Sequence, residues 1–105
     1  LMGGTSSERD VSLASGLRVV GALRSRGHQV TALDPASGVL DDTALTALAA
    51  GVRRAPPTPA ELAALAAHAL GAGLGTHAAI RDADVVFNAL HGGAGEDGTV
   101  QAILD

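Results

Sequence analysis

Residues 1–34 read LMGGTSSERDVSLASGLRVVGALRSRGHQVTALD, and this stretch decides the predicted fold. An apolar start followed by two glycines is typical of a strand end and a tight turn. Apolar residues then recur at the spacing of a helix that would stop at Gly27, and residues 29–33 predict a strand that ends at Asp34-Pro35. The apolar helical positions are Leu13, Leu17, Val20 and Leu23. A strand, a helix and a strand in this order predict a βαβ unit with a parallel sheet and a right-handed crossover.

The second half of the chain adds a further strand and a second glycine-rich loop. Residues 84–90, DVVFNAL, form a continuous apolar run, which is typical of a strand buried on both faces. The loop 91–98 follows, and residues 99–104 predict a helix. Because ligands of open α/β sheets bind at the carboxyl ends of the strands, we expect loop 91–98 to meet loop 3–8 there.

Helix starts are indicated by capping residues. We expect a capping box of Thr5 with Glu8, a second helix over residues 43–50 and a third that begins after Thr58. A break at residues 53–57 separates the second helix from the third. The remaining expected caps are Asp41 or Asp42 for the second helix, Glu61 as the partner of Thr58, and Asp97 or Gly98 with Gln101 for the helix over 99–104.

Composition excludes several classes of site. The 105 residues carry a formal net charge of -4, which argues against binding to nucleic acid or to an anionic membrane. All seven basic residues are arginines, so the sequence holds no P-loop or Schiff-base lysine. There is no cysteine, which fits a cytoplasmic protein. No apolar run approaches the roughly 20 residues of a membrane span.

The two loops allow both structural and functional interpretations. Loop 3–8 opens a helix, where free N–H groups favour anions, but it equally fits a capped turn. Glu8 is either a capping partner or a carboxylate that receives a cation. His91 follows a strand, where it is either a site residue or a structural one. For Glu96 and Asp97 a helix cap is favoured over a magnesium site, and we expect no metal ligands in this chain.

Two segments together resemble one known family. Residues 1–16, LMGGTSSERDVSLASG, resemble the opening motif of the D-alanine–D-alanine ligases. Residues 85–101, VVFNALHGGAGEDGTVQ, resemble their second N-terminal motif and occur in the right order. The resemblance implies a Rossmann-like, three-layer α/β domain with a parallel sheet of the pre-ATP-grasp type. Residues 1–105 would be the N-terminal substrate-binding domain, truncated at both ends and inactive alone.

The resemblance also implies a reaction and a set of site residues. The complete enzyme would join two D-alanines through an acyl phosphate, for peptidoglycan precursors, in the cytoplasm and as a homodimer. ATP and Mg²⁺ would bind to domains outside this chain. Glu8 matches the glutamate that binds the amino group of the first D-alanine, and His91 matches the histidine beside its carboxylate. Gly3, Gly4 and Ser6 would complete the substrate pocket.

The sequence allows two other interpretations. One is a non-catalytic Rossmann-like module that binds a small anion or a nucleotide through the first glycine loop. The other is a truncated product with no function of its own. The sequence beyond Asp105 would distinguish them from a ligase, since a ligase requires ATP-grasp domains there.

Overall fold

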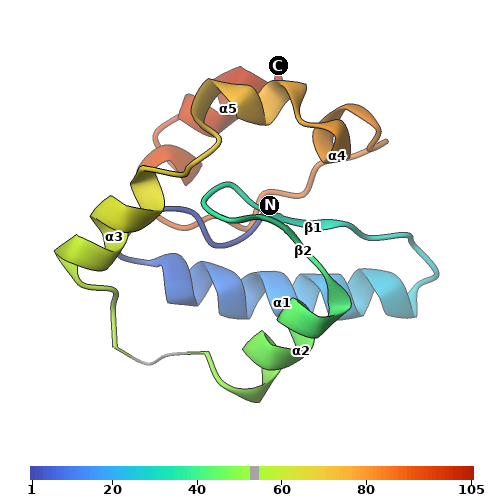
Figure 1. The fold of residues 1–105 in the computed structure, drawn as a ribbon. Coiled ribbons are helices and arrows are strands. Elements are labelled where there is room, and N and C mark those ends of the chain that lie inside the picture. Colours follow the sequence, from blue (N-terminus) through green and yellow to red (C-terminus); the bar gives the residue numbers. More distant parts are fainter. Residues whose placement is uncertain (53–54) are drawn as a thin grey trace.

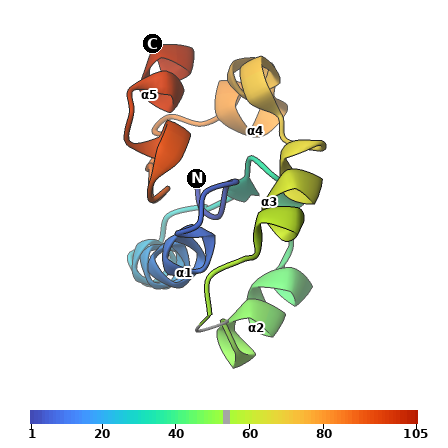
Figure 2. The ribbon, with the colours of Figure 1, turned by 90° about the vertical axis from the view of Figure 1, so that its left-hand side faces the viewer.

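The structure, a computed structural model, describes residues 1–52 and 55–105 and has a mixed α/β architecture (Figure 1). Extended segments form the middle, with α1 and α2 on one side and α4 and α5 on the other (Figure 2). Positions 53 and 54 of the predicted break lie outside the described residues. The elements are α1 (Arg9–Ser25), β1 (Ala32–Asp34), β2 (Gly38–Leu40), α2 (Asp42–Ala50), α3 (Pro59–Ala66), η1 (Gly71–Thr76), α4 (Ala78–Arg81), η2 (Gly93–Gly95) and α5 (Thr99–Leu104).

The regular sheet is an antiparallel hairpin of β1 and β2, with Ala32 opposite Leu40. Proline occupies the second position of the turn, and the Ser37 N–H donates to the Asp34 carbonyl at 3.1 Å. Asp34-Pro35 therefore reverses the chain, where the sequence predicted only the end of a strand. In the described part of the chain the assigned sheet has these two antiparallel strands, in place of the predicted parallel sheet.

Backbone hydrogen bonds nevertheless place residues 1–2 between β1 and the segment 87–89. The Met2 N–H donates to the Leu33 carbonyl at 3.1 Å. On the other side, the Leu1 nitrogen donates to the Phe87 carbonyl at 2.6 Å and the Ala89 N–H donates to the Leu1 carbonyl at 2.9 Å. These last two bonds flank one residue of the partner segment, which is the pattern of parallel strands. The carboxyl ends of the three extended segments consequently lie at one edge.

Residues 84–90 differ from the predicted buried strand. Val85 is 83% exposed and Phe87 is 53% exposed. The segment borders a cavity of about 600 Å³, whose other walls include α1 and residues 28–33. Because no described segment fills this cavity, the backbone there lacks a ladder partner over most of its length, and no strand is assigned to it.

Helices α1, α2, α3 and α5 lie where the sequence predicts them, whereas η1 and α4 were not predicted. Asp41 caps α2 by accepting from the Ala44 N–H, and Thr58 caps α3 in the predicted capping box. For α1, however, the N-cap is Glu8, whose side chain makes no capping bond. The predicted Thr5–Glu8 capping box is wrong because the Ser6 hydroxyl accepts the Glu8 N–H at 3.1 Å instead.

Two hydrophobic clusters hold the extended segments between the helices. The first joins Met2 and Ala32 to the buried face of α1, where Leu13 and Val20 lie as predicted, and to Leu45 of α2. The second consists of Leu33, Leu74 and Val100, with neighbours from α4 and α5 packed against them. The layers therefore fix the edge at which both glycine loops leave the extended segments.

Candidate functional site

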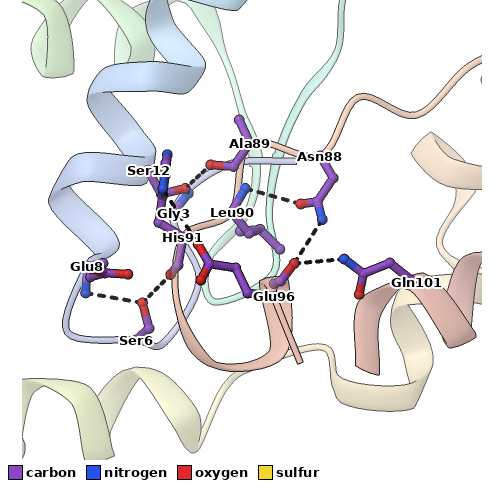
Figure 3. Close-up of polar contacts among 11 residues, drawn as sticks. Gly3, Ser6, Glu8, Ser12, Asn88, Ala89, Leu90, His91, Glu96 and Gln101 are labelled. Atoms are coloured by element: carbon purple, nitrogen blue, oxygen red, sulfur yellow. Dashed lines mark hydrogen bonds and ion pairs between the residues drawn. The ribbon is translucent and has the colours of Figure 1, made fainter. Parts of the chain in front are cut away.

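The two glycine-rich loops lie together, as the sequence predicts (Figure 3). The Ser6 hydroxyl donates to the His91 carbonyl at 2.5 Å, across 85 positions of sequence. The same oxygen accepts the Glu8 N–H at 3.1 Å. Ser6 thus connects the start of α1 with the residue that opens the second loop.

Ser12 forms a second connection, beneath the first. Its side chain is fully buried on the inner face of α1. The hydroxyl accepts the Gly3 N–H at 2.8 Å and donates to the Ala89 carbonyl at 2.7 Å. Sequence analysis missed this residue, although a serine beside Leu13 on the apolar face of a predicted helix is a signal of a buried polar contact.

The Glu8 side chain is exposed at the N-terminus of α1 and lies against the second loop. A Cβ atom on Gly92 would lie 2.8 Å from Glu8 Oε2 and 3.2 Å from Ser6 Oγ. The backbone of Gly92 has a φ of +68°, which side-chain-bearing residues rarely adopt. Glycine at this position therefore lets the carboxylate approach the second loop.

His91 lies at the point where the extended segment becomes the second loop. Its side chain is 38% exposed, and Nδ1 is 3.8 Å from Glu96 Oε1. This distance is longer than a hydrogen bond, and the contact with Ser6 fixes the backbone carbonyl of His91, not its ring. The imidazole is partly exposed, at the edge where the two loops leave the extended segments (Figure 3).

Two side-chain amides bond to the middle of the second loop. Asn88 Nδ2 and Gln101 Nε2 both donate to the Gly95 carbonyl, at 3.2 and 2.8 Å. Asn88 Oδ1 also accepts the Leu90 N–H at 3.1 Å. Gly95 is buried, and a Cβ atom on it would lie 2.5 Å from the Leu90 side chain. The loop is consequently anchored at both ends and in its middle.

The first glycine loop uses its own N–H groups internally. Gly3 donates to Ser12, and the Gly4 N–H donates to Asp34 Oδ1 at 2.9 Å. Asp34 is fully buried, and it forms an ion pair with Arg9 at 2.6 Å. Burial raises the pKa of Asp34, but hydrogen bonds from Arg9, Ser37, Gly4 and Ala36 outweigh it and hold the pKa below its ordinary value. These two glycines thus offer no free donor to an external phosphate.

Of the two acidic residues in the second loop, Asp97 supports the start of α5, whereas the Glu96 carboxylate faces His91 at 3.8 Å. Gly98 is the N-cap of α5, and Asp97 Oδ1 accepts the Thr99 N–H at 2.9 Å. Hydrogen bonds from the Thr99 side chain and backbone lower the pKa of the exposed Asp97 carboxyl. Across residues 1–52 and 55–105, no group of three or more histidine, aspartate or glutamate side chains is arranged to hold a metal ion. Over the same residues, no helix has the length and apolar character needed to cross a bilayer.

Comparison with known proteins decides the family. The family model described as "D-ala D-ala ligase N-terminus" matches residues 1–105. The chain belongs to this family. The relative from Gluconobacter oxydans (strain 621H), named D-alanine--D-alanine ligase, is 41% identical over 105 residues, which are 100% of this chain and 24% of the relative. The relative of the same name from Sphingopyxis alaskensis is 42% identical over 100% of this chain and 23% of its own length.

Membership of the D-Ala–D-Ala ligase N-terminus family agrees with the resemblance that residues 1–16 and 85–101 carry. The chain spans about a quarter of the length of the curated relatives it matches. Of the residues that sequence analysis singled out, the structure joins Ser6 to both Glu8 and His91. Gly3 and Gly4 lie in the same first loop, but they bond to Ser12 and Asp34.

Proposed function

We propose that this chain provides the site for the first of two D-alanines in an ATP-dependent, ADP-forming D-alanine–D-alanine ligase. The observation that carries the proposal is the 2.5 Å hydrogen bond from Ser6 to the His91 carbonyl. It joins the loop that bears the exposed Glu8 side chain to the loop that bears the partly exposed His91 side chain. Relatives named D-alanine--D-alanine ligase align over the whole chain and support the choice of substrate.

In this proposal Glu8 binds the amino group of the first D-alanine. An ammonium group is best held by a fixed carboxylate, because hydrogen bonds between charged partners are stronger than neutral ones. The exposed Glu8 carboxylate makes no capping bond to α1. The Ser6 contact to the Glu8 N–H fixes its backbone, and Gly92 leaves room beside it.

His91 then acts on the carboxylate of the same D-alanine. A carboxylate oxygen of the substrate attacks the γ-phosphorus of ATP, ADP leaves, and an acyl phosphate forms. The amine of the second D-alanine attacks the acyl carbon, phosphate leaves with the C–O bond pair, and the amine loses a proton. A hydrogen-bond donor at His91 stabilises the charge that develops on the acyl phosphate. Gly3 and Gly4 form one wall of the pocket with their backbone atoms.

ATP and Mg²⁺ are assigned to parts of the complete enzyme outside residues 1–105. This assignment rests on the family resemblance, and it is consistent with the Gly3 and Gly4 N–H groups donating to Ser12 and Asp34. In the complete enzyme we expect residues 1–2, 32–34 and 87–89 to belong to one parallel, Rossmann-like sheet. A cytoplasmic homodimer that supplies peptidoglycan precursors is part of the same proposal.

The alternative of an anion- or nucleotide-binding module is less well supported. It needs free N–H groups on the first glycine loop, but Gly3 donates to Ser12 and Gly4 donates to Asp34. The nearby guanidinium of Arg9 is committed to Asp34 and to the Gly4 carbonyl. These contacts favour a loop that supports a neighbouring site over one that cradles a phosphate.

The test is Glu8→Gln in the complete ligase that contains these residues. We expect the KM for the first D-alanine to rise about tenfold or more, because a hydrogen bond to a charged group contributes about 1.5–3 kcal/mol. The KM for ATP should stay unchanged. Asp84→Asn, an exposed charge removal away from both loops, is the control. Unchanged D-alanine kinetics for Glu8→Gln would reject the role of Glu8.

A further inference from the structure

Arg9 and Asp34 form an ion pair that packs against the first glycine loop, and the proposed function gives neither residue a contact with the substrate. The Asp34 side chain is 0% exposed and that of Arg9 is 15% exposed. Arg9 Nη2 donates to Asp34 Oδ2 at 2.6 Å. Four donors in total satisfy the two carboxylate oxygens, which is what a buried charge needs.

This pair holds a single residue, Gly4, by both its polar backbone groups. Asp34 Oδ1 accepts the Gly4 N–H at 2.9 Å, and Arg9 Nη1 donates to the Gly4 carbonyl at 2.7 Å. Gly3 completes the fit, because a Cβ atom there would lie 2.8 Å from Asp34 Cγ and 3.0 Å from Arg9 Nη1. The loop, the strand end and the first helical residue are thereby locked to one another.

The consequence reaches Glu8, the carboxylate proposed to bind the substrate's amino group. Arg9 is the first residue of α1 and directly follows Glu8 in the chain. A guanidinium that grips Gly4 fixes the distance between the start of the loop and the start of the helix. Ser6, midway between them, is fixed in turn on the His91 carbonyl. The position of Glu8 is therefore set by a loop that Arg9 holds at Gly4 and that the His91 carbonyl holds at Ser6.

We propose that Arg9 and Asp34 are positioning residues that set the place of Glu8 for the first D-alanine. The inference rests on the proposed function, since it concerns the site that binds the amino group. Its chemical basis is the planar fork of arginine, which bonds a carboxylate and a carbonyl at once. Lysine at the same position keeps the charge beside Asp34 but cannot reproduce both directed bonds.

The deciding variant is Arg9→Lys in the complete ligase. We expect the first-site KM, fitted from the two-site dependence of ADP formation on D-alanine, to rise about tenfold, since small displacements of binding groups have large kinetic effects. The KM for ATP should not change. Asp34→Asn should show the same pattern and gives a second, independent variant.

Ser37→Ala is the matched control. Ser37 donates to the same carboxylate, at 2.7 Å, but it is exposed and makes no bond to Gly4. A purely structural role for the pair predicts that Arg9→Lys and Ser37→Ala both lower the melting temperature and leave the first-site KM alone. That result, in an active wild-type enzyme, overturns the positioning role. A complete wild-type protein without D-alanine-dependent ADP formation overturns the proposed function, and the inference with it.

Discussion

Ser12 and Ala89 are 77 positions apart in the sequence, and a 2.7 Å hydrogen bond from the Ser12 hydroxyl to the Ala89 carbonyl joins them. The same hydroxyl accepts the Gly3 N–H at 2.8 Å. One buried side chain thus satisfies a polar backbone group on each of two segments that lead into the site. Because neither group has access to water there, the relationship carries a stability prediction.

Ser12→Ala should destabilise the protein by about 2 kcal/mol, because it leaves a buried N–H and a buried carbonyl without partners. The free energy of unfolding, from urea denaturation of the complete protein, measures the effect. Ser15→Ala is the control, since it makes the same change on the same helix at a half-buried position. Equal stability of the two variants would contradict the connecting role of Ser12.

Asp34 predicts a dependence of stability on pH. Its pKa in the folded protein lies below the ordinary 3.8 of an unfolded aspartate. The folded state therefore gains stability from the ionised carboxylate above 3.8, and it loses that gain as the pH falls through the lower folded value. Asp34→Asn should have a lower urea midpoint than wild type at pH 7, and the difference should shrink at about pH 3.

Asp97 provides the contrast for this experiment. Its pKa is also lowered, but the carboxyl is exposed, so solvent screens its interactions and its contribution is small. Asp97→Asn should follow the pH profile of the wild-type protein. A profile for Asp34→Asn that matches wild type would show that the buried ion pair with Arg9 is not the source of acid sensitivity.

Local signals in the sequence predicted α1, α2, α3 and α5, but not α4. The meeting of the two loops was predicted from the rule that ligands bind at the carboxyl ends of parallel strands. Thr58 was predicted as a cap, and Asp41 was one of two candidates for another, because a capping bond depends on residues that are close in the chain. The Thr5–Glu8 box failed because the Ser6 hydroxyl, one residue on, competes for the same N–H group. Local rules do not rank such competitors.

The remaining contacts depend on residues far apart in the chain. The sequence predicts that Asp34 ends a strand, but it does not predict that its carboxylate accepts a hydrogen bond from the Gly4 N–H, 30 positions away. The strand over residues 84–90 failed in a similar way, since a regular strand needs neighbours along its length and the described residues leave a cavity there. Apolar periodicity predicts which residues can be buried, but not which segment covers them.

Gly92→Ala should weaken substrate binding by more than its loss of stability accounts for. The new Cβ would lie 2.8 Å from Glu8 Oε2, so the carboxylate must move. We expect the KM for the first D-alanine to rise about tenfold in the complete ligase. Gly38→Ala is the control, because its φ of +91° carries a comparable backbone strain while its Cβ would meet no atom within 4 Å. The same KM for both variants would reject close contact between Glu8 and the second loop.

His91→Gln separates turnover from binding. If His91 stabilises the developing acyl phosphate, its loss should lower kcat about a hundredfold, as removal of a transition-state donor does in other enzymes. The KM for ATP should change little, because the interaction is made chiefly in the transition state. His68→Gln changes an exposed histidine that follows α3 and lies outside both loops, and it should leave both constants unchanged. An effect of His91→Gln confined to the KM for ATP would place His91 at the nucleotide and away from the acyl group.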